Sequence, residues 1–125
     1  MARTDLATME KKTVVRRLRK SDYDAVCRLQ LKCFPGMSPW TREQFDSQIR
    51  RFPEGQLCVE VQRRIVASSA SLIVDFRRHS AWHNWRDISD NGYIRNHDPA
   101  GDTMYGIEIM VDPEFRGMKL ARRLY

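Results

Sequence analysis

The chain has 125 residues and a mass of 14.8 kDa, which allows one modest domain and excludes two independent cores. Hydrophobic residues make up 42% of the chain and charged residues 30%, which excludes a wholly disordered protein. The apolar stretches are far shorter than the roughly 20 residues of a membrane-spanning helix. The N-terminus has no apolar segment of the kind that secretory signals carry, so we expect a globular cytoplasmic domain with no membrane partner.

Positive charge is concentrated at the start of the chain. The net charge is +6, and the first 20 residues hold seven basic and two acidic side chains. Residues 1–12 are polar and aperiodic, and we interpret them as a flexible basic leader to a domain over residues 13–125. The remainder of the chain is nearly balanced in charge, so we expect no nucleic-acid partner; binding of nucleic acid through the leader is a third hypothesis.

Two helices are predicted in the first half of the chain, after a β-branched strand over residues 13–19. Ser21 with Asp24 resembles a capping box, and apolar residues at helical spacing predict a helix to about Cys33. A proline and a glycine end that helix. Thr41 with Gln44 forms a second capping box and predicts a second amphipathic helix.

Three further strands are predicted in the second half. Residues 57–62 alternate between apolar and polar side chains, which predicts a half-buried strand. A longer strand over residues 65–76 follows as the second arm of a hairpin, although the connection lacks the usual Asn-Gly or Asp-Gly turn. Residues 77–103 show no periodicity and are interpreted as a long loop. Residues 105–111 alternate again, with Gly106 as a candidate β-bulge.

The cysteines and histidines do not indicate a metal site. Cys27, Cys33 and Cys58 show no C-x-x-C spacing, which favours free thiols in a reducing compartment over disulfides or zinc ligands. His79 and His83 stand four residues apart without a third ligand at a known spacing. We therefore expect no bound metal.

The last twenty residues carry the most specific pattern, a strand followed by an Arg-Gly turn and a basic helix that starts near Met118. Such a turn presents backbone N–H groups at the positive end of a helix dipole, where a phosphate binds well. The basic side chains that would deepen this field are Arg116, Lys119, Arg122 and Arg123. An ordinary strand-to-helix turn with a solvated basic face is the alternative.

This segment resembles the GNAT superfamily of acetyltransferases. The superfamily motif, Arg/Gln-x-x-Gly-x-Gly/Ala, falls on residues 116–121, where Lys119 stands in place of the usual glycine. Residues from about Thr13 to the end, most clearly residues 85–125 with Asn96-His97-Asp98-Pro99, are similar to the N-terminal acetyltransferase-like part of bacterial proteins that continue into a carbon–nitrogen hydrolase of the nitrilase superfamily. The resemblance implies an α/β (α+β) fold with a mixed, mostly antiparallel central sheet flanked by helices. It also implies that this fold is incomplete after the helix that follows the fourth strand, with a fused hydrolase domain beyond Tyr125.

The resemblance further implies acetyl-CoA as co-substrate and direct transfer of its acetyl group to a small-molecule or peptide amine. The cofactor-binding residues would be Ile109, Met110 and Val111, which pair with the pantetheine arm through their backbone, and Arg116, Gly117, Met118, Lys119, Leu120, Ala121 and Arg122, which hold the pyrophosphate.

Glu108 is the candidate catalytic general base, because an amine acceptor needs a carboxylate or a water chain beside it. It lies on the strand before the loop, and we expect it on the opposite face from Ile107 and Ile109. An exposed or salt-bridged glutamate is the alternative interpretation. The general acid would follow Tyr125 in the chain.

Aromatic and histidine side chains crowd the long loop, where acyltransferases commonly shape the acceptor site. They are Trp82, His83, Trp85, Tyr93 and His97. The alternative is that these side chains only pack within the domain. For the domain as a whole, the alternative to an enzyme is a non-catalytic acyl-CoA-binding or regulatory module attached to a hydrolase, a hypothesis motivated by Lys119.

Overall fold

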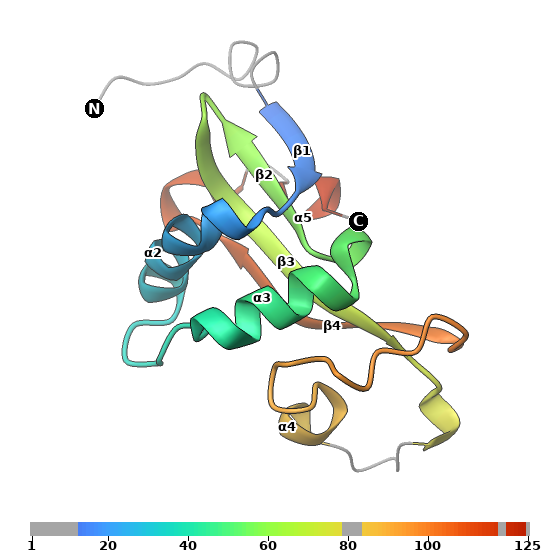
Figure 1. Cartoon of the computed structure of the whole chain (residues 1–125). Coiled ribbons are helices and arrows are strands. Elements are labelled where there is room, and N and C mark those ends of the chain that lie inside the picture. Colours follow the sequence, from blue (N-terminus) through green and yellow to red (C-terminus); the bar gives the residue numbers. More distant parts are fainter. Residues whose placement is uncertain (1–12, 79–83, 118–119, 125) are drawn as a thin grey trace.

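The computed structural model describes residues 13–78, 84–117 and 120–124 (Figure 1). Its strands and helices are β1 (Thr13–Arg17), α2 (Tyr23–Cys33), α3 (Arg42–Arg51), β2 (Leu57–Val61), β3 (Arg64–Val74), α4 (Trp85–Ile88), β4 (Thr103–Val111) and α5 (Leu120–Arg123). The strands form one sheet in the order β1-β2-β3-β4, and every neighbouring pair is antiparallel. The predicted order of elements and the fold class are confirmed, with α4 as an addition inside the predicted loop. The predicted leader lies outside the described residues.

Helices cover both faces of the sheet. Helices α2 and α3 lie across one face, and α5 lies behind the other (Figure 1). The larger core fills the space beneath α2 and α3, and a smaller core beneath α5 includes Val59 and Leu124. Cys58 and Val59, which point to opposite faces of β2, are both 0% exposed. The predicted half-buried strand is therefore wrong for β2, because helices cover it on both sides.

One of the two predicted helix caps is confirmed. The Gln44 amide donates to Thr41 Oγ1 at 3.1 Å and the Thr41 amide donates to Gln44 Oε1 at 2.9 Å, which starts α3 with a reciprocal capping box. The predicted cap at Ser21 is wrong. A 3₁₀ turn over Lys20–Asp22 precedes α2, and Asp22 Oδ2 accepts the Arg19 amide at 2.7 Å.

The β2–β3 connection is a two-residue turn in the left-handed conformation. Val61 pairs with Arg64, and the intervening Gln62 and Arg63 have φ values of 49° and 66°. Two positive φ angles are typical of a type I′ turn, whose twist matches that of the flanking strands. The predicted hairpin is thus confirmed. Because its turn lacks the usual Asn-Gly or Asp-Gly pair, each of its two non-glycine residues has a conformational cost of about 1–2 kcal/mol.

Strand β4 contains a bulge that turns its side chains. The register with β3 shifts at Ile107, one residue after the predicted bulge at Gly106. Ile107 packs in the core beneath α2, and Glu108 accepts a hydrogen bond from a side chain of α2. The expectation that Glu108 faces away from Ile107 is therefore wrong, because a bulge sets two residues against one on the neighbouring strand.

The long loop is fastened to the body of the domain. Asn84 caps α4 by accepting the Asp87 amide at 2.8 Å, and Ile88 and Ile94 on either side of the following turns are 0% exposed. The Asp98 amide donates to the carbonyl of Ile73 on β3 at 2.8 Å. The loop therefore forms a packed layer beside α3 and β3. None of the described helices combines the length and the hydrophobicity that a membrane-spanning segment needs.

Candidate functional site

A cavity of about 740 Å³ opens where α2, the segment before α3, α4 and β4 meet. Its lining is rich in aromatic and apolar side chains, among them Phe34, Met37, Trp40, Trp85 and Ile107. Gln30 and Glu108 also line it, and Arg86 brings a basic side chain to its wall. An apolar cavity with a few polar groups is typical of small-molecule sites.

Glu108 is held in this cavity by two neutral donors. Trp40 Nε1 donates to Glu108 Oε1 at 3.1 Å, and Gln30 Nε2 donates to Glu108 Oε2 at 2.9 Å. No salt bridge to Glu108 occurs among the residues the structure describes. Burial raises the pKa of Glu108, and the two hydrogen bonds oppose that rise without cancelling it. The carboxyl group is thus neither freely exposed nor salt-bridged.

Gln30 connects Glu108 to the backbone of the next segment. Its Oε1 accepts the Trp40 amide at 2.9 Å. A backbone N–H can only donate, so this contact fixes which end of the Gln30 amide faces Glu108. The Tyr23 hydroxyl donates to the carbonyl of Trp40 at 2.8 Å, which fixes the same residue from its other side.

Sequence reasoning missed both Gln30 and Trp40 as site residues. Gln30 is 6% exposed and stands four residues after the buried Val26, on the apolar face of α2. A polar side chain at such a position needs a buried partner, and that signal could have identified it.

A stacked pair of tryptophans forms one wall of the cavity. The ring centroids of Trp40 and Trp85 lie 5.6 Å apart with an angle of 16° between the ring planes. Trp85 Nε1 donates to the carbonyl of Ile107 at 2.9 Å, at the bulge beside Glu108. Gly92 packs closely against the Trp40 ring, since a Cβ atom at position 92 would lie 2.6 Å from Trp40 Cζ3. The loop thereby supports the site from the side opposite α2.

The other predicted acceptor-site residues of the loop have different positions. Tyr93 packs against Arg95, whose guanidinium carbon lies 4.8 Å from the ring centroid. His97 stacks on Phe52 at 4.3 Å and its Nδ1 accepts the Ile73 amide at 3.0 Å. Neither Tyr93 nor His97 lines the cavity, and both side chains pack elsewhere in the domain. Trp82 and His83, like His79, lie outside the described residues.

The predicted cofactor-binding residues follow Glu108 along the chain. Ile109, Met110 and Val111 complete β4, which pairs with β3 and with no other described strand. Val111 lies three residues beyond Glu108, about 10 Å along a strand. At this end of β4, Arg116 Nε donates to the carbonyl of Val111 at 3.2 Å.

The turn after β4 contains a glycine in the left-handed conformation. Gly117 has a φ of 87°, a left-handed conformation that glycine adopts readily. Leu120 and Ala121 begin α5, and Arg122 is exposed on it. Met118 and Lys119 lie outside the described residues. Among the residues that are described, no three His, Cys, Asp or Glu side chains are grouped so as to hold a metal ion.

Comparison with known proteins gives two curated relatives from Bacillus subtilis (strain 168). The probable hydrolase YhcX is 49% identical over 121 residues, which cover 97% of this chain and 24% of YhcX. The uncharacterized N-acetyltransferase YkwB is 38% identical over 114 residues, which cover 88% of this chain and 50% of YkwB. The chain thus spans about a quarter of the length of YhcX and half of the length of YkwB.

Solved structures share the fold at low identity. The loading GNATL domain of CurA from Lyngbya majuscula has a TM-score of 0.74 at 19% identity, covering 90% of this chain and 54% of that domain. The GphF GNAT-like decarboxylase in complex with isobutyryl-CoA has a TM-score of 0.68 at 21% identity, covering 89% of this chain and 54% of the decarboxylase chain. The profile of the acetyltransferase (GNAT) family matches residues 23–125. The chain therefore belongs to the GNAT family of acyltransferases, as its final strand-turn-helix segment predicted.

Proposed function

We propose that this chain provides part of an N-acyltransferase that moves an acetyl group from acetyl-CoA to an amine, with Glu108 as the general base. The observation that carries the proposal is the environment of Glu108 in its largely apolar cavity. Both carboxylate oxygens accept hydrogen bonds from neutral side chains, and burial raises the pKa. A carboxylate used as a base becomes more effective as its pKa approaches the working pH.

The proposed reaction is a direct displacement at the thioester carbonyl. The amine nitrogen forms a bond to the carbonyl carbon, and Glu108 accepts the proton that this nitrogen loses, directly or through one water. The carbon–sulfur bond then breaks, and the sulfur leaves as a thiolate that is protonated in turn. The largely apolar cavity lowers the local dielectric, so hydrogen bonds to the developing charge act more strongly there than in water.

The acyl donor would bind along β4 and the turn that follows it. The backbone of residues 109–111, in the edge strand β4, would pair with the pantetheine arm. Arg116, Gly117 and the amides through Arg122 would hold the pyrophosphate, supported by the left-handed Gly117 and the start of α5. The short run of strand between this turn and Glu108 would bring the acyl end toward the cavity.

The proposal also concerns the rest of the protein. Residues 13–125 would form an incomplete acetyltransferase domain, and further strands and the general acid would come from additional chain. The partial coverage of YkwB supports this, and the similarity to YhcX supports a hydrolase domain fused on the C-terminal side. A cytoplasmic location agrees with the three free cysteines.

The test is release of coenzyme A from acetyl-CoA by the purified full-length protein, which includes the rest of the acetyltransferase domain, in the presence of a panel of amines. We expect amine-dependent release that falls about 10²–10⁴-fold in Glu108→Gln. Glu43→Gln, an exposed residue on α3, is the matched control and keeps full activity. Binding of acetyl-CoA without any transfer would refute the proposal and favour a non-catalytic acyl-CoA-binding module.

A second pair of variants tests the phosphate turn. Arg116→Gln removes a positive charge beside the turn, and Arg50→Gln removes one from an exposed position on α3. We expect weaker acetyl-CoA binding in the first variant and unchanged binding in the second. Equal affinity in both variants would refute the assignment of Arg116.

A further inference from the structure

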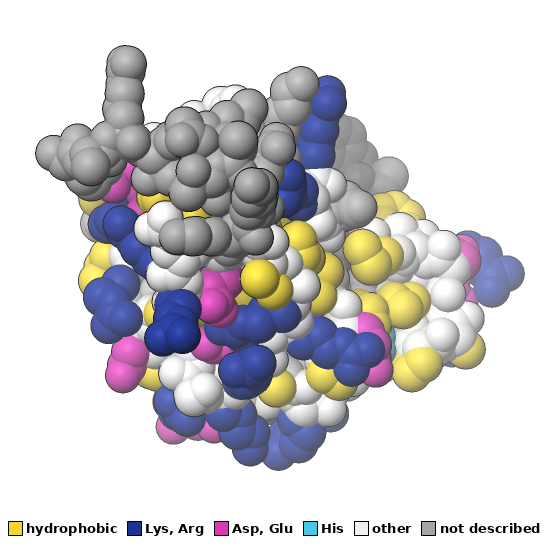
Figure 2. All heavy atoms as spheres, turned by 90° about the horizontal axis from the view of Figure 1, so that it is seen from above, with side chains coloured by type: hydrophobic (Ala, Val, Ile, Leu, Met, Phe, Trp, Pro, Cys, Tyr) yellow, Lys and Arg dark blue, Asp and Glu magenta, His cyan; other side chains and the backbone are white. Residues whose placement is uncertain are grey.

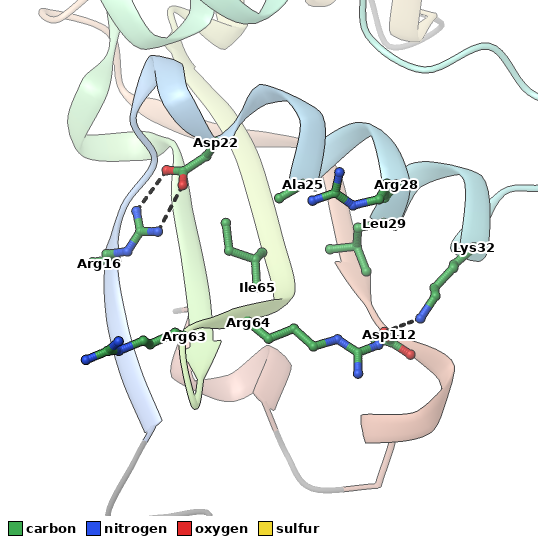
Figure 3. A pocket seen from close by; sticks show the side chains of 10 residues that line it. All are labelled: Arg16, Asp22, Ala25, Arg28, Leu29, Lys32, Arg63, Arg64, Ile65 and Asp112. Atoms are coloured by element: carbon green, nitrogen blue, oxygen red, sulfur yellow. Dashed lines mark hydrogen bonds and ion pairs between the residues drawn. The ribbon is translucent and has the colours of Figure 1, made fainter. Parts of the chain in front are cut away.

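A second cavity, of about 390 Å³, opens between α2 and the β2–β3 hairpin (Figure 3). It shares no lining residue with the cavity around Glu108. Its charged lining residues are Arg16, Arg28, Lys32, Arg63, Arg64, Asp22 and Asp112. Basic groups therefore outnumber carboxylates in its wall. Figure 2 views the molecule from the end that carries β1 and the hairpin turn, where Lys and Arg side chains gather with Asp and Glu between them.

Arg16 is already neutralised and serves as a fixed wall of this cavity. Its two terminal nitrogens donate to the two oxygens of Asp22 at 2.8 and 3.0 Å, and its Nε donates to Glu60 at 2.8 Å. The side chains of Arg16 and Asp22 are only 17% and 11% exposed. A guanidinium with two carboxylate partners has no free charge to offer a ligand.

The opposite wall has the reverse balance, with two cations on a single carboxylate. Asp112 Oδ2 accepts Lys32 Nζ at 3.0 Å and Arg64 Nη2 at 3.1 Å, while Oδ1 accepts the Glu114 amide at 3.0 Å. Asp112 is 3% exposed, whereas Lys32 and Arg64 are 45% and 48% exposed. Glu114 approaches Arg64 only at 3.9 Å. Both cations line the cavity and keep N–H groups that Asp112 does not accept.

Arg28 adds a third cation to this group. It stands four residues before Lys32, so both side chains lie on the same face of α2, where like charges repel. No acidic partner of Arg28 is found within the described ranges, and the cavity that it lines has an apolar floor formed by Leu29 and Ile65 (Figure 3). An anion placed between these three cations would relieve that repulsion and receive donors from two elements.

We propose that Arg28, Lys32 and Arg64 form a binding site for a small anion with two or more negative charges, such as a phosphate ester or a dicarboxylate. Guanidinium groups hold planar pairs of oxygens, and the lysine ammonium adds a point charge, so both ligand types suit this set. The apolar floor would accept the uncharged body of the ligand. The site is separate from the proposed acetyl-CoA site.

The experiment is calorimetric titration of the purified protein with inorganic phosphate and, separately, with succinate at constant ionic strength. We expect saturable binding of at least one anion, weakened about tenfold in Arg28→Gln. Arg28→Gln is the most suitable variant, because this exposed side chain has no ion pair or hydrogen bond among the described residues that its loss would break. Tighter binding of phosphate identifies a phosphoryl site, and tighter binding of succinate identifies a carboxylate site; either result supports the proposal.

Two controls separate this site from the proposed acetyl-CoA site. Arg50→Gln on α3 and Arg116→Gln beside the phosphate turn should both leave anion affinity unchanged, and saturating coenzyme A should not displace the anion. Equal affinity in Arg28→Gln and the unaltered protein would overturn the proposal. Loss of binding in Arg116→Gln, or displacement by coenzyme A, would also overturn it, because the anion would then occupy the acyl-donor site.

Discussion

Gln30→Met tests whether Gln30 positions Glu108 and supports its ionised form. Methionine has nearly the same shape but makes neither hydrogen bond, so the buried Trp40 amide loses its acceptor and Glu108 loses one of two donors. An unsatisfied buried amide costs about 1–3 kcal/mol, and a hydrogen bond to a charged group contributes about 1.5–3 kcal/mol. The added apolar contact offsets part of this loss, so we expect a destabilisation of about 2–4 kcal/mol.

The same substitution should change the pH dependence of transfer. The lost hydrogen bond opposes the rise that burial causes in the pKa of Glu108, so its removal raises this pKa further. The base is active when deprotonated, and the acidic limb of kcat/KM therefore moves to higher pH.

Gln48→Met is the matched control for this prediction. Gln48 is also a buried glutamine on a helix, but its side chain donates to the carbonyl of Gly92 at 2.8 Å. We expect both variants to unfold at lower denaturant concentration than the unaltered protein. Only in Gln30→Met should the acidic limb of the kcat/KM profile move to higher pH. An unchanged pH profile in Gln30→Met would refute the positioning of Glu108 by Gln30.

Three further outcomes follow from other contacts. Asp112→Asn leaves two cations without their shared carboxylate and should lower stability at neutral pH by about 1–3 kcal/mol. Burial alone would raise the pKa of Asp112, but the Glu114 amide and the neighbouring cations lower this pKa below its ordinary value of 3.8. The stabilisation that the ionised Asp112 contributes is therefore present above pH 3.8 and is lost as the pH falls through the folded-state pKa. Between neutral pH and about pH 3, the free energy of unfolding measured in denaturant should therefore fall less in the variant than in the unaltered protein. An equal fall in both proteins would contradict this prediction. Replacing the turn residues, Gln62→Asn with Arg63→Gly, should raise the free energy of unfolding by about 1–2 kcal/mol, and no gain would argue against the type I′ turn. Gly92→Ala places a Cβ 2.6 Å from the Trp40 ring at a φ of 83°, so near-ultraviolet circular dichroism should show a disturbed tryptophan pair, and an unaltered spectrum would contradict this packing.

Local patterns in the sequence predicted the elements well. The Thr41 capping box starts α3 as expected, because all of its partners lie within three residues of one another. The alternation of the strands and the breaks at proline and glycine likewise depend on neighbours in the chain. The burial of β2 on both faces could not be predicted in this way, because α5, which covers one face, lies far along the chain.

The candidate site was predictable only in part. Glu108 was found because it precedes a recognisable turn, but its partners were not, since Gln30 and Trp40 lie 78 and 68 residues away in the chain. The bulge at Ile107, which sets the face that Glu108 occupies, depends on the register with β3. Contacts of this kind arise only when the sheet and helices assemble.

The most direct test of the account is a crystal structure of the protein with coenzyme A bound. We expect the pyrophosphate at the turn after β4, the pantetheine arm along residues 109–111, and the sulfur in the cavity beside Glu108. A sulfur atom far from Glu108, or a nucleotide seated in the cavity around Arg28 and Arg64, would contradict it.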